Sequence, residues 1–96
     1  MIARVSRAEV PAEQIDAVVE AYREHVRPVH AQAEGLDQHY VLIDHETGRI
    51  EIVGIWDSAD ALAAAGPTLE PARRRLWSEF GTNPSLELYE VADELR

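Results

Sequence analysis

The 96-residue sequence predicts an α+β fold with four strands and two helical regions in the order β-α-β-β-α-β. Three observations lead to this prediction: a hairpin pattern over residues 36–56, a helix-starting proline at position 11, and a turn cluster over residues 81–85 before a last strand. Strands connected in this order form one antiparallel sheet with its helices on a single face, which is the ferredoxin-like arrangement.

The hairpin is the clearest of these elements. Leu36–Asp44 and Arg49–Trp56 are rich in β-branched and aromatic residues, and a short polar turn separates them. Gly48 supplies the positive φ that a hairpin loop of this length needs. Asp57 and Ser58 follow the second run and offer side-chain oxygens to the free N–H groups at the start of a helix. Trp56 is expected to be a packing residue at this corner.

The first strand is expected over Met1–Ala8 and the first helix from Pro11, a residue favoured at the first helical position. Apolar residues then recur at helical spacing and give the helix one buried stripe. Pro28 removes a backbone donor late in this pattern, so we expect the helix to end or kink around His25–Arg27.

The second helical region is expected in two pieces. Ser58–Ala65 is rich in alanine, and Gly66-Pro67 should stop it because both residues disfavour the interior of a helix. Leu69–Phe80 should form the second piece, with Leu86–Val91 as the closing strand.

Composition bounds the class of protein. Residues 1–96 are enough for one domain with a thin core, and the content of 46% hydrophobic and 28% charged residues is typical of a soluble globular chain. No cysteine is present, so disulfides and thiolate chemistry are excluded. The net charge of −9 argues against a nucleic-acid partner. Neither a signal peptide nor a membrane-spanning run is visible, so we expect a cytoplasmic protein without a membrane partner.

The predicted sheet has helices for only one of its faces, yet apolar residues occupy both strand parities. Val5, Val41, Ile43, Val53, Ile55 and Val91 supply apolar groups to either face, depending on register. A second copy packed sheet to sheet is the simplest cover for the remaining face. We therefore expect a homodimer.

Gly35 ahead of the second strand and the segment Gly54-Ile55-Trp56-Asp57-Ser58-Ala59-Asp60-Ala61-Leu62 resemble the antibiotic-biosynthesis monooxygenase family of dimeric α/β barrels. Leu88-Tyr89-Glu90-Val91 matches the apolar-acidic-apolar end of that family. The resemblance implies a homodimeric barrel with a ligand cavity between sheet and helices in each subunit. Its members include cofactor-independent oxygenases of polyphenols and quinols, haem-degrading enzymes and proteins without known activity.

The haem-degrading branch of the family uses an Asn, a Trp and a His that align with Ser6, Ala65 and Arg75. All three residues differ here, so the resemblance argues against haem degradation. The histidine that the family commonly carries around its third helix is also missing.

The histidines indicate no metal site. His25 and His30 are five residues apart and would point about 140° from each other on one helix, and no carboxylate completes a ligand set. His39 lies near the start of a strand and His45 in the hairpin turn. His25, three residues after Tyr22, is the candidate general base at the rim of a cavity, with a solvated helix histidine as the alternative.

Arg4 is the candidate partner of an anion. It shares a strand face with Ile2, where a charge must be paired or lie beside a cavity. A salt bridge to a neighbouring carboxylate, Glu51, Glu87 or Glu90, is one explanation, and an anionic substrate is the other.

Tyr22, Arg73 and Trp77 complete the expected substrate-binding residues. Trp77 lies one helical turn after Arg73 and suits the wall of a cavity for a flat aromatic ligand, with core packing as the alternative. Phosphate loops, dinucleotide fingerprints and serine elbows are absent.

If the protein is an enzyme, the resemblance implies a cofactor-independent monooxygenase that oxidises a small phenolic or quinol-type substrate with O2, without metal or bound cofactor. A non-catalytic module that binds a small apolar or aromatic molecule or another protein is the alternative, and an isomerase on the same plan stays open.

Overall fold

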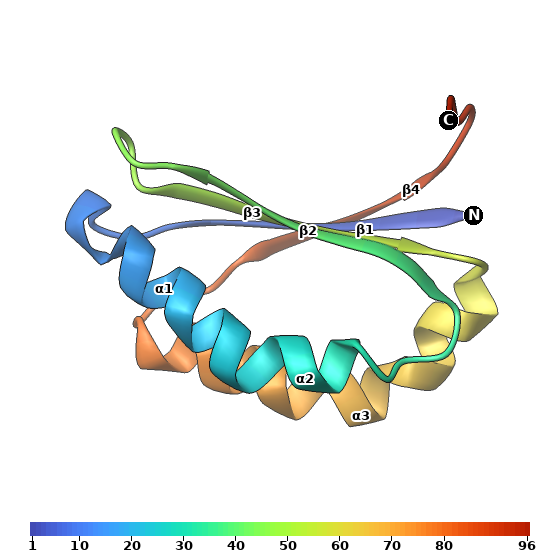
Figure 1. Cartoon of the computed structure of the whole chain (residues 1–96), viewed down its shortest axis with the longest axis horizontal. Coiled ribbons are helices and arrows are strands. Elements are labelled where there is room, and N and C mark those ends of the chain that lie inside the picture. Colours follow the sequence, from blue (N-terminus) through green and yellow to red (C-terminus); the bar gives the residue numbers. More distant parts are fainter.

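The computed structural model describes residues 1–96 and consists of one four-stranded antiparallel sheet in the order β2-β3-β1-β4, with all helices on one face (Figure 1). The ferredoxin-like prediction is therefore confirmed. The two hairpin strands have the predicted bounds, whereas the first and last strands are displaced by a single residue. The strands are β1 (Ile2–Glu9), β2 (Leu36–Asp44), β3 (Arg49–Trp56) and β4 (Ser85–Glu90).

The first helical region runs past Pro28, and of the two outcomes predicted around His25–Arg27, an end or a kink, the structure shows an irregular π-helical turn and no end. A short 3-10 turn and α1 are followed by a π-helical turn, in which the Arg27 N–H donates to the Tyr22 carbonyl. Pro28 then lies in the first turn of α2, where a missing N–H costs no helical hydrogen bond. The segments are η1 (Ala12–Gln14), α1 (Ile15–Ala21), the π-helical turn (Tyr22–Val26) and α2 (Arg27–His30).

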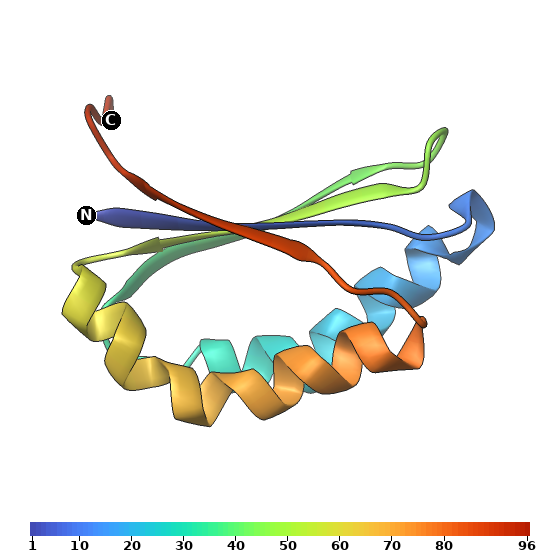
Figure 2. The same ribbon diagram turned by 180° about the vertical axis from the view of Figure 1, so that it is seen from behind.

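The second helical region is one helix, α3 (Ala59–Glu79), so the predicted division at Gly66-Pro67 was wrong. The helix bends instead: its yellow start descends steeply from the sheet, and its orange end runs along it (Figure 2). Ser58 caps the start as predicted, with its Oγ accepting from the Ala61 N–H at 3.0 Å. Packing of buried residues after the bend outweighs the local preference to stop. No helix of the chain has both the length and the apolar composition of a membrane span.

The core lies between the sheet and the helices. Trp56 is completely buried at the corner that leads into α3, as predicted. Side chains of α1, the π-helical turn and α3 pack onto the inner side of β3. The cluster consists of Val10, Ile15, Val18, Ala21, Tyr22, Val26, Ile50, Ile52, Leu76 and Trp77.

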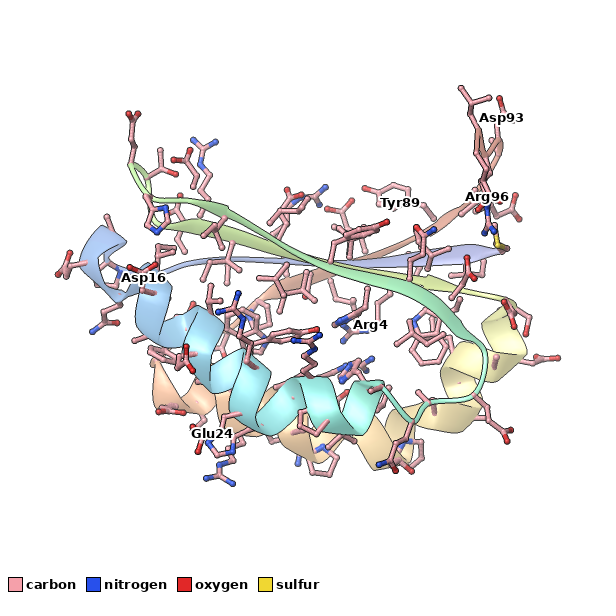
Figure 3. The ribbon with its side chains drawn as sticks, in the orientation of Figure 1. Arg4, Asp16, Glu24, Tyr89, Asp93 and Arg96 are labelled. Atoms are coloured by element: carbon pink, nitrogen blue, oxygen red, sulfur yellow. The ribbon has the colours of Figure 1, made fainter.

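The register assigns each strand residue to a face, because residues opposite each other in neighbouring strands share one. One row on the helix-covered, inner face runs His39, Gly54, Arg4, Leu88 across the four strands. The outer face carries the row Tyr40, Val53, Val5, Glu87. In Figure 3, Arg4 points from the sheet toward the helices and Tyr89 points to the opposite, bare face.

Gly48 has a φ of +78°, and a Cβ on this residue would lie 1.9 Å from the carbonyl oxygen of Val10. Gly48→Ala should therefore lower the free energy of unfolding by at least about 2 kcal/mol, through backbone strain and this clash. Gly66→Ala is the matched control, because nothing lies within 4 Å of its added Cβ and the residue is helical. It should stabilise the fold by about 0.5–1 kcal/mol. Urea unfolding of both variants tests the pair, and a Gly48→Ala variant as stable as the parent would contradict the strain.

Candidate functional site

Arg4, Arg73 and Trp77 come together at an open pocket of about 560 Å³ between β1, the C-terminal half of α3 and the loop that follows it. Arg4 reaches the pocket from the inner face of the sheet, and the other two reach it from one side of α3. Trp77 and Arg73 are 7% and 9% exposed, so these two side chains belong to the core and also line the pocket. Three of the predicted substrate-binding residues thus share one site.

The positive charge of this pocket is incompletely paired. Arg73 has one carboxylate partner, Glu70, at 3.6 Å between Nη1 and Oε2, and that carboxylate is half exposed. Arg4 makes no side-chain hydrogen bond or ion pair. Burial lowers the pKa of Arg4, and Glu70 only partly offsets this. Burial and then the charge of Arg4 lower the pKa of Arg73 to about 10. The site therefore presents an excess of buried positive charge.

The carboxylates that were candidate partners of Arg4 are not available to it. Glu51 lies on the outer face and accepts from Arg7 Nε at 2.7 Å, and Glu87 also pairs with Arg7. Glu90 shares the inner face but forms no ion pair with Arg4. The salt-bridge explanation for Arg4 was thus wrong, because strand alternation puts two of these carboxylates on the opposite side of the sheet.

Two histidines that were not predicted as site residues lie behind the arginines. His30 is buried, and its ring stacks on that of His39 with centroids 4.6 Å apart and an angle of 29° between the planes. His39 Nδ1 is 2.6 Å from the hydroxyl of Tyr22, and His30 Nδ1 is 3.1 Å from the carbonyl oxygen of Val26. No group of three His, Asp or Glu side chains comes together at a spacing that would hold a metal ion.

Both histidines are neutral at physiological pH. Burial, followed by the charge of Arg73, lowers the pKa of His30 to about 4. Burial lowers that of His39 to about 3, with His30, Arg73 and Arg4 adding to the shift. Burial raises the pKa of Tyr22, so its hydroxyl stays protonated. The cluster therefore combines two neutral proton acceptors with two cations.

A void of about 10 Å³ joins the histidines to the arginines. It is lined by Arg4, His30, His39, Arg73 and Trp77, among others. Space of this size holds about one water molecule. Gly54 lies between His39 and Arg4 in their cross-strand row, and a Cβ there would approach His39 Cδ2 to 3.2 Å. The missing side chain makes room for the histidine ring.

His25 and Tyr22 do not join the arginine pocket as predicted. His25 is partly exposed on the π-helical turn, with Nε2 3.8 Å from a Glu24 oxygen, and lines neither the pocket nor the void. The π-helical turn and the continued helix direct His30, not His25, to the interior. Tyr22 lines a separate opening with His39, Arg23 and Arg27.

The signals for the two missed histidines were present in the sequence. His30 continues the buried stripe of Tyr22 and Val26 at a spacing of four residues, but the end or kink expected around His25–Arg27 left the direction of its side chain open. His39 has the same strand parity as Val41, which packs against the core. The register of the hairpin, which the sequence left open, decides that this parity faces inward.

A larger groove of about 770 Å³ lies between α2 and the first half of α3. Its polar groups hold the fold together: Ser58 caps α3, and the Asp57 N–H donates to the Gly35 carbonyl at 2.8 Å. No arginine, lysine or histidine lines it. The arginine pocket is therefore the better candidate despite its smaller volume.

The two buried histidines should make folding stability depend on pH. Their pKa is lower in the folded protein than the ordinary value of 6.5, so the unfolded chain takes up protons first as the pH falls. The free energy of unfolding should have its full value above pH 6.5. It should decrease toward pH 4 by about 1.4 kcal/mol per pH unit for each histidine. Urea unfolding across this range measures the slope. A His30→Gln, His39→Gln double variant should show a flatter slope and His25→Gln the original one; identical slopes in all three proteins would refute the assignment.

Comparison with known proteins gives relatives for the whole chain. An uncharacterized protein of Mycobacterium tuberculosis is 29% identical over 90 residues, which cover 94% of this chain and 40% of that protein. This chain thus spans less than half the length of that curated relative. SnoaB, a cofactor-independent oxygenase from Streptomyces nogalater, has a TM-score of 0.74 at 16% identity, with 98% and 95% of the two chains covered.

A dimeric ferredoxin-like protein from an uncultured marine organism has a TM-score of 0.78 at 13% identity, with 99% and 97% of the two chains covered. Identities this low establish the fold alone. Family membership comes from the sequence itself, since the profile described as "Antibiotic biosynthesis monooxygenase" matches residues 1–66, more than half of the chain. The match includes β1, the hairpin and the cap of α3, where the sequence resemblance was found. The chain belongs to the antibiotic biosynthesis monooxygenase family.

Proposed function

We propose that this domain is a cofactor-independent monooxygenase that oxidises a small phenolic or quinol-type substrate with O2. The observation that carries the proposal is the convergence of Arg4 and Arg73, with their incompletely paired charge, on the aromatic wall of Trp77. Family membership and the fold shared with SnoaB, a cofactor-independent oxygenase, support it. A flat aromatic ring stacks on Trp77, and its oxygen faces the guanidinium groups.

The arrangement suits chemistry in which the substrate itself is the reductant. A phenolate is a far better electron donor to O2 than the neutral phenol, and buried guanidinium groups stabilise that anion. When a ring CH2 beside a phenolate is converted to C=O, the substrate loses four electrons and both hydrogens. One oxygen atom then enters the product and the other leaves as water, so the reaction balances without a further reductant.

Arg4→Met and Arg73→Met should each lower kcat/KM for the best substrate by about 10–100-fold, because a hydrogen bond to a charged group is lost. Oxygen consumption with a panel of phenols and quinols measures the effect. Arg75→Met is the matched control, since Arg75 is exposed on the same helix and lines none of these sites. Arg4→Met should also raise the free energy of unfolding by about 1 kcal/mol, because it removes a half-buried charge without a partner.

If the wild-type protein consumes no oxygen with any member of the panel, the proposed monooxygenase activity is overturned. Retained binding of a phenol in that protein would favour the alternative function, a non-catalytic module for small aromatic ligands. A loss of stability in Arg4→Met would instead point to a structural role for Arg4.

We also propose that the domain acts as a homodimer in which the outer faces of two sheets pack together. This face has no helix over it (Figure 1). By the strand register, apolar side chains from all four strands lie on it. Tyr40, Leu42 and Tyr89 are 49%, 50% and 46% exposed there. Association of two such faces removes this apolar surface from water, which is the main driving force of stable homodimers.

Leu42→Glu should convert the dimer into a monomer with an intact fold, because Leu42 is half exposed in the single chain and a carboxylate cannot be buried unpaired. Light scattering at micromolar concentration should give twice the mass of one chain for the wild type and a single mass for the variant. Leu95→Glu, at a 99% exposed position, should remain dimeric. A monomeric wild type would refute the association.

A further inference from the structure

The tautomer of His30 is fixed by its surroundings. Its Nδ1 lies 3.1 Å from the carbonyl oxygen of Val26, which can only accept a hydrogen bond. Nδ1 therefore carries the hydrogen of the neutral ring, and Nε2 keeps a free electron pair. The tautomer of His39 is not fixed in this way, because the partner of its Nδ1 is the hydroxyl of Tyr22, which can donate or accept a hydrogen bond. His30 is the histidine with a defined basic nitrogen.

The position of His30 relates it to the proposed substrate pocket. His30 borders the void that Arg4, Arg73 and Trp77 also line, and the same three residues line the open pocket. The void is about 10 Å³ and admits no substrate ring. A ring stacked on Trp77 would lie in the open pocket, with its hydroxyl directed inward. From there, one water in the void spans the path to the histidine.

The charges around His30 favour uptake of a proton only when an anion forms beside it. Burial and the charges of Arg73 and Arg4 keep the ring neutral. Glu70 faces the same arginines from the rim, and the stacked ring of His39 is neutral. A phenolate between the arginines cancels part of their positive charge. The free-energy cost of protonating His30 therefore falls as the substrate hydroxyl releases its proton.

We propose that His30 Nε2 accepts the proton of the substrate's phenolic hydroxyl while the phenolate settles between Arg4 and Arg73. The O–H bond breaks with its electron pair left on oxygen, an N–H bond forms at Nε2, and the total charge of the site is unchanged. His39 is a positioning residue, whose stacked ring, held by Tyr22, keeps the ring of His30 in place. The identity of the substrate rests on the proposed function, whereas the route of the proton is testable without turnover.

The probe is 4-nitrophenol, whose anion absorbs visible light, added to the full chain at a pH where the free phenol is mostly protonated. Wild-type protein should bind it as the anion, seen as the visible band. Calorimetry in buffers of different ionisation enthalpy should detect no net release of a proton, because His30 retains it. In His30→Phe, the bound phenol should stay neutral or its proton should appear in the buffer. His25→Phe is the matched control and should behave as wild type.

The outcomes separate the two proposals. An anion bound by His30→Phe without proton release overturns the assignment of His30, and so does a wild-type protein that binds no 4-nitrophenol. His30→Gln, checked by circular dichroism, repeats the measurement with a smaller polar side chain if the phenylalanine variant fails to fold. With an active substrate, His30→Phe should lower kcat by about 100-fold. If the protein retains the proton of the bound phenol but consumes no oxygen with any phenol or quinol, the proposed monooxygenase activity alone is overturned.

Discussion

The burial of two guanidinium groups on the helix-covered side of the sheet is the constraint on which the rest of the site depends. Arg4 cannot turn to the outer face, because strand alternation fixes its side, and the outer carboxylates Glu51 and Glu87 already pair with Arg7. Arg73 arrives from α3 with a single half-exposed partner. In a chain of net charge −9, positive charge without enough carboxylates is a local property of this pocket and not of the surface as a whole.

Burial is the main reason that the histidines are neutral. It opposes the protonation of His30 and His39, and the cations beside them act in the same direction. The two neutral rings can therefore accept a proton, and an incoming anion is what relieves the repulsion by the cations. Arginines and histidines thus act as one unit, in which binding of negative charge and uptake of a proton favour each other.

Much of the fold was predictable because its signals are local. Hairpin bounds, the Ser58 cap and the buried Trp56 depend on residues close in sequence, and these predictions are confirmed. The wrong division at Gly66-Pro67 came from treating a proline as a stop. Pro28 and Pro67 are instead accommodated by a π-helical turn and a bend, and the helix segments that follow them carry buried residues. Arg4, Arg73 and Trp77 were found from parity and helical spacing, whereas His30 and His39 required the register and the continued helix.

The two faces of the sheet have opposite effects on the stability of this small domain. A chain of 96 residues buries a thin core, and this one buries Arg73 and His30 within it and places the half-buried Arg4 and His39 beside them, each of which opposes stability. The outer face carries Val5 and Val53 opposite each other, and its charged residues Arg7, Glu51 and Glu87 are paired with one another. In the proposed dimer, burial of the apolar surface of that face offsets the stability that is lost through the charged groups of the inner site. A substitution that relieves the arginine pocket should then make the isolated chain less dependent on its partner copy, since both effects act on the same folding equilibrium.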